Sequence, residues 1–89
     1  MLYMVVESFR GDAIPVYRRF RASGRLAPEG LRYVTSWVTS DFGGCFQVMD
    51  CDDPALLEAW TANWEDVVEF EVFPVVTSVE AAATIAPDL

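Results

Sequence analysis

Each strand that can be predicted in this 89-residue chain carries large apolar side chains on both of its faces. Side chains alternate between two rows along a strand. In the segment 2–9 one row is Leu2, Met4 and Val6, and the other is Tyr3, Val5, Glu7 and Phe9. So short a chain has helices enough to cover only one face of a sheet, and a large uncovered apolar face marks an interface. The pattern therefore predicts a partner subunit on the second face.

Local signals predict the order of the elements. Strands are expected over residues 2–9, 31–39, 44–51 and 67–76, and helices over residues 13–23, 54–64 and from Thr77 to about Pro87. Asp12 and Asp53 are suited to cap the first two helices, and Thr77 with Glu80 forms a capping box before the third. Asp41-Phe42-Gly43 fits a three-residue hairpin loop with Gly43 in the left-handed conformation. That loop pairs Trp37 with Gln47 and Thr35 with Met49.

The order βαββαβ followed by a short helix predicts one ferredoxin-like α+β domain over residues 1–89, with a four-stranded antiparallel sheet. Pro74 suits an edge strand because it cannot donate to a ladder. The face expected under the helices carries Leu2, Met4, Val6, Val34, Val38, Phe46, Val48, Val68, Phe70 and Val72. The other face collects Tyr3, Val5, Glu7, Phe9, Tyr33, Thr35, Trp37, Cys45, Gln47, Met49, Val67, Glu69, Glu71 and Phe73. Two such sheets packed face to face predict a homodimer, a dimeric α/β barrel.

The charges are divided unevenly along the chain. Residues 1–32 hold all six basic residues, which are arginines, against three acids, a balance of +3, and residues 33–89 hold eleven acids and no base, a balance of −11. The net charge of −8 repels phosphate backbones, so no nucleic-acid partner is expected. The arginines form either a solvated helix face or a surface that meets the acidic half of a neighbouring subunit or an anionic ligand.

The absence of histidine and the spacing of the two cysteines exclude several kinds of functional site. It has no histidine, which removes the commonest general base and most zinc and haem sites, so no metal or cofactor is expected. Cys45 and Cys51 lie too far apart along one strand for a disulfide and are expected to be buried free thiols. No apolar run reaches the ~18 residues of a membrane span, and the N-terminus lacks the pattern of a secretory signal. A soluble cytoplasmic protein without a membrane partner is expected.

Four segments together resemble a known family. They are Met4-Val5-Val6-Glu7-Ser8-Phe9, Pro28-Glu29-Gly30-Leu31-Arg32-Tyr33-Val34-Thr35-Ser36-Trp37, Cys45-Phe46-Gln47-Val48-Met49 and Phe70-Glu71-Val72-Phe73-Pro74-Val75. They are similar to domain-of-unknown-function family 3303, and the likeness covers nearly the whole chain. The resemblance implies the dimeric α/β-barrel superfamily, whose relatives include cofactor-independent monooxygenases and muconolactone isomerases. It implies no particular activity.

The second face predicts an interior site. Its polar groups are Glu7, Gln47 and Glu71, and its apolar lining is Tyr3, Tyr33, Trp37, Met49 and Phe73. A mostly apolar pocket with a few convergent polar groups is typical of a small-molecule site. An aromatic or hydrophobic molecule is expected between Tyr33 and Trp37, with Gln47 and Tyr33 orienting a substrate oxygen. Burial would raise the pKa of Glu7 and suit it to act as a general base, coupled to Glu71.

Two functions remain open at this point. One is a ligand-binding protein, with or without a carboxylate-based, cofactor-independent reaction. The other is a non-catalytic dimeric structural or interaction module whose barrel is filled by its own side chains. In that case Glu7 and Glu71 pair with Arg32 or with an interface arginine and only fix the dimer. Metal binding by Asp50, Asp52 and Asp53 is the weakest possibility, since these residues are suited to cap the helix that follows.

Overall fold

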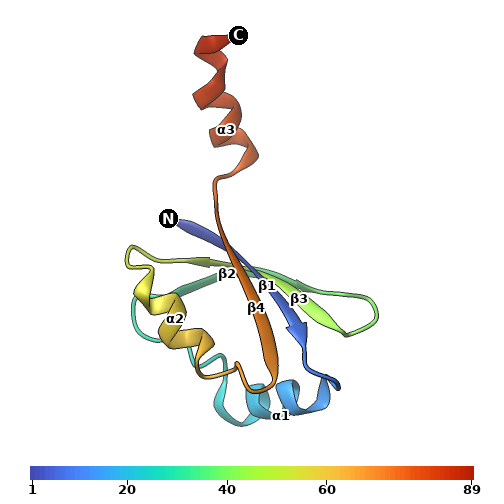
Figure 1. The fold of residues 1–89 in the computed structure, drawn as a ribbon. Coiled ribbons are helices and arrows are strands. Elements are labelled where there is room, and N and C mark those ends of the chain that lie inside the picture. The colour runs from blue at the N-terminus through green and yellow to red at the C-terminus, as the bar shows by residue number, and fades with distance from the viewer.

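The computed structural model, which covers residues 1–89, has the predicted order βαββαβ with a short C-terminal helix (Figure 1). Its strands are β1 (Leu2–Phe9), β2 (Arg32–Val38), β3 (Gly44–Asp50) and β4 (Val68–Val75). Its helices are α1 (Ile14–Ser23), α2 (Ala55–Thr61), α3 (Ser78–Ile85) and the 3-10 turn η1 (Ala86–Asp88). The predicted ferredoxin-like arrangement is confirmed.

Side chains at the predicted positions help to start the three helices. The N–H groups of Ile14, Ala55 and Glu80 donate to the side chains of Asp12, Asp53 and Thr77, at 2.8, 3.0 and 3.1 Å. These bonds satisfy backbone donors that have no partner inside the first turn of a helix. Helix α2 ends at Thr61, earlier than predicted, so Trp64 lies in the turns that follow it.

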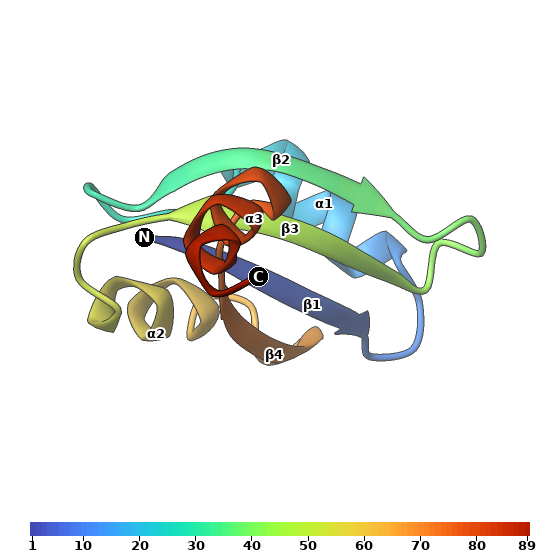
Figure 2. The ribbon, with the colours of Figure 1, turned by 90° about the horizontal axis from the view of Figure 1, so that it is seen from above.

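The sheet has the order β2-β3-β1-β4, and all neighbouring strands are antiparallel. β1 and β3 are central, and Pro74 lies on the edge strand β4, as predicted. Helices α1 and α2 lie on one side of the sheet, which we call the helix-covered face. Helix α3 projects away from the other side, the open face (Figures 1 and 2).

The helix-covered face is not the one predicted for β1 and β3. Val5, Gln47 and Met49 are at most 4% exposed, and the two apolar ones belong to a core that includes Leu57 and Trp60 of α2. The rows that contain Val5 and Met49 therefore face the helices, and the alternate rows lie on the open face. In β4 the prediction was right, because Val68 and Phe70 pack in the same core. Both rows of β1 are apolar, so alternation alone could not decide between them.

Two irregularities shift the register of β2. The hairpin loop spans residues 40–43 rather than 41–43, and Phe42 adopts the positive φ of 60° predicted for Gly43. Trp37 therefore pairs with Phe46 rather than with Gln47. A β-bulge between Tyr33 and Thr35 then inserts one residue. Because a shift of one residue moves a side chain to the other face, Tyr33 and Trp37 lie on opposite faces of the sheet.

The same irregularities correct the second predicted pair of this hairpin. Thr35 pairs with Val48 on the open face, whereas Met49 pairs with Tyr33. Neither of the two pairings expected from the shorter loop is formed.

Gly44 is buried at the start of β3, where there is no room for a side chain. A Cβ atom there would collide with the backbone carbonyl oxygen of Glu7 on β1. We expect Gly44→Ala to lower the free energy of unfolding by about 1–3 kcal/mol, the usual cost of overpacking. Chemical denaturation measures this loss. Gly43→Ala is the control, because its nearest neighbour is the movable carboxylate of Asp41, and an equal loss in both variants would contradict the argument.

Candidate ligand-binding site

A cavity of about 180 Å³ lies between helix α1 and the helix-covered face of the sheet. Its apolar walls are Phe9, Val16, Phe20, Val38, Trp60 and Trp64. Its remaining lining is Glu7, Tyr17, Arg25, Ser36, Cys45 and Gln47. An apolar cavity of roughly 150 Å³ holds benzene. This one therefore has room for a single aromatic ring with a small substituent.

Glu7 supplies the carboxyl group of this cavity from the central strand β1. Burial raises its pKa from the ordinary value of 4.5 to about 7, and Cys45, Arg25 and Gln47 oppose this rise only in part. Gln47 Nε2 donates a hydrogen bond to Glu7 Oε2 at 2.9 Å. A carboxyl group with a pKa near 7 can both accept and return a proton at neutral pH, as a general acid or base must.

Gln47 connects Glu7 to a cation. Arg25 Nε donates to Gln47 Oε1 at 2.7 Å, while the amide nitrogen of Gln47 points to Glu7. Gln47 is only 4% exposed, and both ends of its amide are satisfied by these partners. The chain Arg25–Gln47–Glu7 thus explains how polar side chains are accommodated under the helices, where the sequence predicts an apolar row.

Arg25 is held in place through its backbone. Its carbonyl oxygen accepts hydrogen bonds from the indole nitrogens of Trp60 at 3.0 Å and Trp64 at 2.9 Å. Its guanidinium carbon lies 3.8 Å from the centre of the Tyr33 ring and 5.3 Å from that of Phe20. The two tryptophans thus line the cavity and also hold the loop that carries Arg25.

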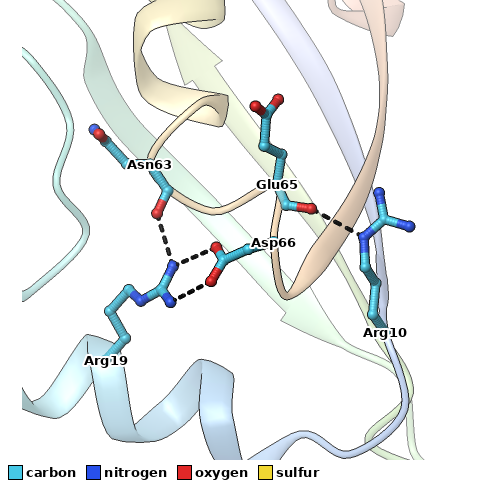
Figure 3. Close-up of polar contacts among 5 residues, drawn as sticks. All are labelled: Arg10, Arg19, Asn63, Glu65 and Asp66. Carbon is cyan, nitrogen blue, oxygen red and sulfur yellow. Dashed lines mark hydrogen bonds and ion pairs between the residues drawn. The ribbon is translucent and has the colours of Figure 1, made fainter.

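A second arginine ties α1, one wall of the cavity, to the segment between α2 and β4 (Figure 3). Arg19 donates from its two terminal nitrogens to the two carboxylate oxygens of Asp66, both at 2.7 Å, and to the carbonyl of Asn63 at 2.8 Å. Arg10 donates to the carbonyl of Glu65 at 2.9 Å. Arg19 therefore binds the acidic half of its own chain. The alternatives expected from the sequence were only a solvated helix face, a neighbouring subunit or an anionic ligand.

Cys45 lies directly opposite Glu7 across the β1–β3 ladder. Burial, together with the neighbouring carboxyl of Glu7, raises the pKa of its thiol to about 12. A thiol that stays protonated is a poor nucleophile and a poor metal ligand. Cys45 and Cys51 are both free, as predicted, although Cys45 is only partly buried. Covalent chemistry at Cys45 is thus disfavoured at neutral pH.

The structure brings together only part of the predicted site. Glu7 and Gln47 line the cavity, and Tyr33 adjoins it through Arg25. Met49 is fully buried in the core, and Tyr3 packs against that core but does not line the cavity.

The other predicted residues lie elsewhere. Trp37, Glu71 and Phe73 pair with Phe46, Val6 and Met4, which places them on the open face. The predicted convergence of all eight side chains on one surface is therefore wrong, and so is the predicted coupling of Glu7 to Glu71. The register of β2, the loop length and the ambiguity of β1 account for these errors.

Fold and site together define a class: a small α+β protein in which helices cover one face of an antiparallel sheet and border a half-open, mostly apolar cavity that contains one carboxyl group. No helix has the length and apolar character needed to cross a membrane, and no group of three His, Cys, Asp or Glu side chains is arranged to hold a metal ion. The chain belongs to the family described as a domain of unknown function, DUF3303, whose model matches residues 1–89. Comparison with curated proteins finds no match, and comparison with solved structures finds none either.

Proposed function

We propose that this protein binds a small aromatic or other hydrophobic molecule in the cavity between α1 and the sheet, and that Glu7 serves there as a cofactor-independent general base. One observation carries the proposal. A carboxyl group whose pKa is raised to about 7 lies in the wall of a mostly apolar cavity. Strongly shifted carboxyl groups in apolar cavities are typical of functional sites.

The proposed chemistry is a proton transfer. The ionised Glu7 takes a proton from the bound molecule, which gains one negative charge, and Glu7 becomes neutral. Arg25 lines the same cavity, and its positive charge favours negative charge on the bound molecule. The proton then returns to the molecule at the same or another atom. Glu7 is suited to both steps because its pKa lies near the working pH.

The tryptophans allow a direct test of binding. The chain has three, of which Trp60 and Trp64 line the cavity and Trp37 lies on the open face. In an NMR titration with a single-ring aromatic compound, we expect the indole N–H signals of Trp60 and Trp64 to shift saturably while that of Trp37 stays unchanged. Replacing each tryptophan in turn by phenylalanine assigns the signals.

The competing function is the non-catalytic module. It predicts that none of the three indole signals responds saturably to any aromatic compound, up to the limit of solubility. That result would remove the ligand-binding proposal, whatever the oligomeric state.

We further propose that the protein is a homodimer, with a second copy covering the open face. Apolar side chains on this face include Trp37, Phe46 and Phe73, which are 59, 44 and 47% exposed. Helix α3 stands off the same side of the sheet, with Val79 81% exposed (Figure 1). Isolated helices this short are marginal in water, so α3 needs a packing partner. A second copy supplies one, because its sheet covers the open face and the two α3 helices cross to the neighbouring subunit.

We place the protein in the cytoplasm. The fold needs no disulfide, since Cys45 and Cys51 are both free, and this is usual for proteins of a reducing compartment.

A further inference from the structure

The side chain of Arg25 has an unused hydrogen-bonding edge. Its Nε donates to Gln47, but its two terminal nitrogens make no hydrogen bond within the chain, and the guanidinium forms no ion pair. Arg19 and Arg32 differ in this respect, because their terminal nitrogens contact the carboxylates of Asp66 and Asp50. Arg25 is also the only basic residue in the lining of the cavity.

The surroundings of Arg25 restrain that edge. The guanidinium carbon lies 3.8 Å from the centre of the Tyr33 ring and 5.3 Å from the centre of the Phe20 ring. The bond to Gln47 and the two indole bonds to the Arg25 carbonyl restrain the rest of the residue. A planar guanidinium with two free N–H groups matches the two oxygens of a carboxylate. A preorganised cation of this kind loses little side-chain entropy when it binds.

The size and composition of the cavity limit the rest of the ligand. A volume of about 180 Å³ accommodates one ring, and two thirds of the twelve lining residues are hydrophobic. Glu7 is the only acid in the lining, so a ligand carboxylate that binds Arg25 meets a single competitor for that cation.

We infer that the ligand is a single-ring aromatic acid, whose carboxylate binds the two terminal nitrogens of Arg25 while its ring fills the apolar remainder of the cavity. The inference rests on the proposed function, and it names the class of molecule. The carboxylate is held at Arg25, and Glu7 exchanges a proton with another part of the molecule.

The test compares two probes of the same size and shape. Phenylacetate carries the carboxylate, and phenylacetamide is its uncharged counterpart. We expect the wild-type protein to bind phenylacetate at least tenfold more tightly, as measured by the shifts of the Trp60 and Trp64 indole signals. Arg25→Gln should reduce the affinity for phenylacetate to that for phenylacetamide. Arg18→Gln, at an exposed position on α1, is the control and should keep the preference.

The outcomes separate the two proposals. Equal affinity of the wild-type protein for both probes would overturn the inference and leave the binding proposal intact. A preference that survives in Arg25→Gln would also overturn it. If neither probe shifts the indole signals, the proposed function itself fails for one-ring compounds. The comparison of probes on the wild-type protein needs no variant, so a folding defect in Arg25→Gln would not leave the inference untested.

Discussion

Glu7→Gln is expected to stabilise the protein above pH 7 by up to about 3 kcal/mol. The pKa of Glu7 is raised from 4.5 in its ordinary state to about 7 in the folded protein, and each unit corresponds to about 1.4 kcal/mol. The folded state therefore holds this proton more tightly than the unfolded state does. Wild-type stability falls as the pH rises from about 4.5 to about 7, and the loss is complete above that range. Glutamine cannot ionise and removes this loss.

Urea denaturation gives the free energy of unfolding of the wild type and of Glu7→Gln at pH 4 and pH 8. The expected effect is that the variant gains stability relative to the wild type between pH 4 and pH 8. Glu65→Gln is the control: it is the same substitution at an exposed position, outside the cavity lining. Asp50 and Asp66 affect the stability in a different pH range. Their partners lower their pKa values, so the stability they contribute is lost only as the pH falls into the acid range. A variant that is less stable than wild type at pH 8 would show that Glu7 is stabilised in its charged form.

Phe46→Asp is expected to convert the proposed homodimer into a monomer. Phe46 lies on the open face between Val6 of β1 and Trp37 of β2. In a face-to-face dimer it becomes buried, and an unpaired carboxylate there is costly to remove from water. In the isolated subunit the same position is 44% exposed and tolerates the charge. Light scattering should show the mass of two chains for the wild type and of one chain, 10.0 kDa, for the variant.

Phe42→Asp is the matched control for this experiment. Phe42 is 67% exposed in the hairpin loop, away from the open face, and its positive φ of 60° suits aspartate better than phenylalanine. It should remain dimeric. A wild-type protein that is a monomer at micromolar concentration would refute the homodimer directly, and dissociation of both variants would show that the open face is not the interface.

The elements were predictable because their signals are local. Asp12, Asp53 and Thr77 begin helices through hydrogen bonds to residues two or three positions further along. Pro74 has no backbone N–H group to donate to a neighbouring strand, so it disfavours a central position for its strand. Such features need no knowledge of distant residues, and the order of elements then leads to the ferredoxin-like topology.

The choice of the buried face was not predictable in the same way. β1 has two apolar rows, and Glu7 argues against burial of the row that holds it. The structure buries that row because Gln47 donates a hydrogen bond to the carboxyl group, while Arg25 in turn donates to Gln47. In β2, one additional loop residue and one bulge residue each move the following side chains to the other face of the sheet. The alternation of apolar and polar residues does not reveal either irregularity.

The cation of the site was missed because nothing local marks it. Arg25 follows the end of α1 and resembles the other arginines of that region in sequence. Its contact with Gln47 spans 22 residues, and those with Trp60 and Trp64 span 35 and 39. Trp60 and Trp64 are four residues apart, a spacing that favours contact with the same neighbours. The spacing alone does not indicate that both indoles donate to the carbonyl oxygen of Arg25.

Both outer strands of the sheet are interrupted, and this limits how the protein can aggregate. β2 has its ladder distorted by the bulge after Tyr33, and β4 contains Pro74, which lacks an N–H group. An incoming strand would meet an irregular backbone along β2 and a missing donor near the end of β4, so both edges are weakened as templates for strand addition. Fibril growth by this route is therefore discouraged, even though the chain is rich in apolar β-strands.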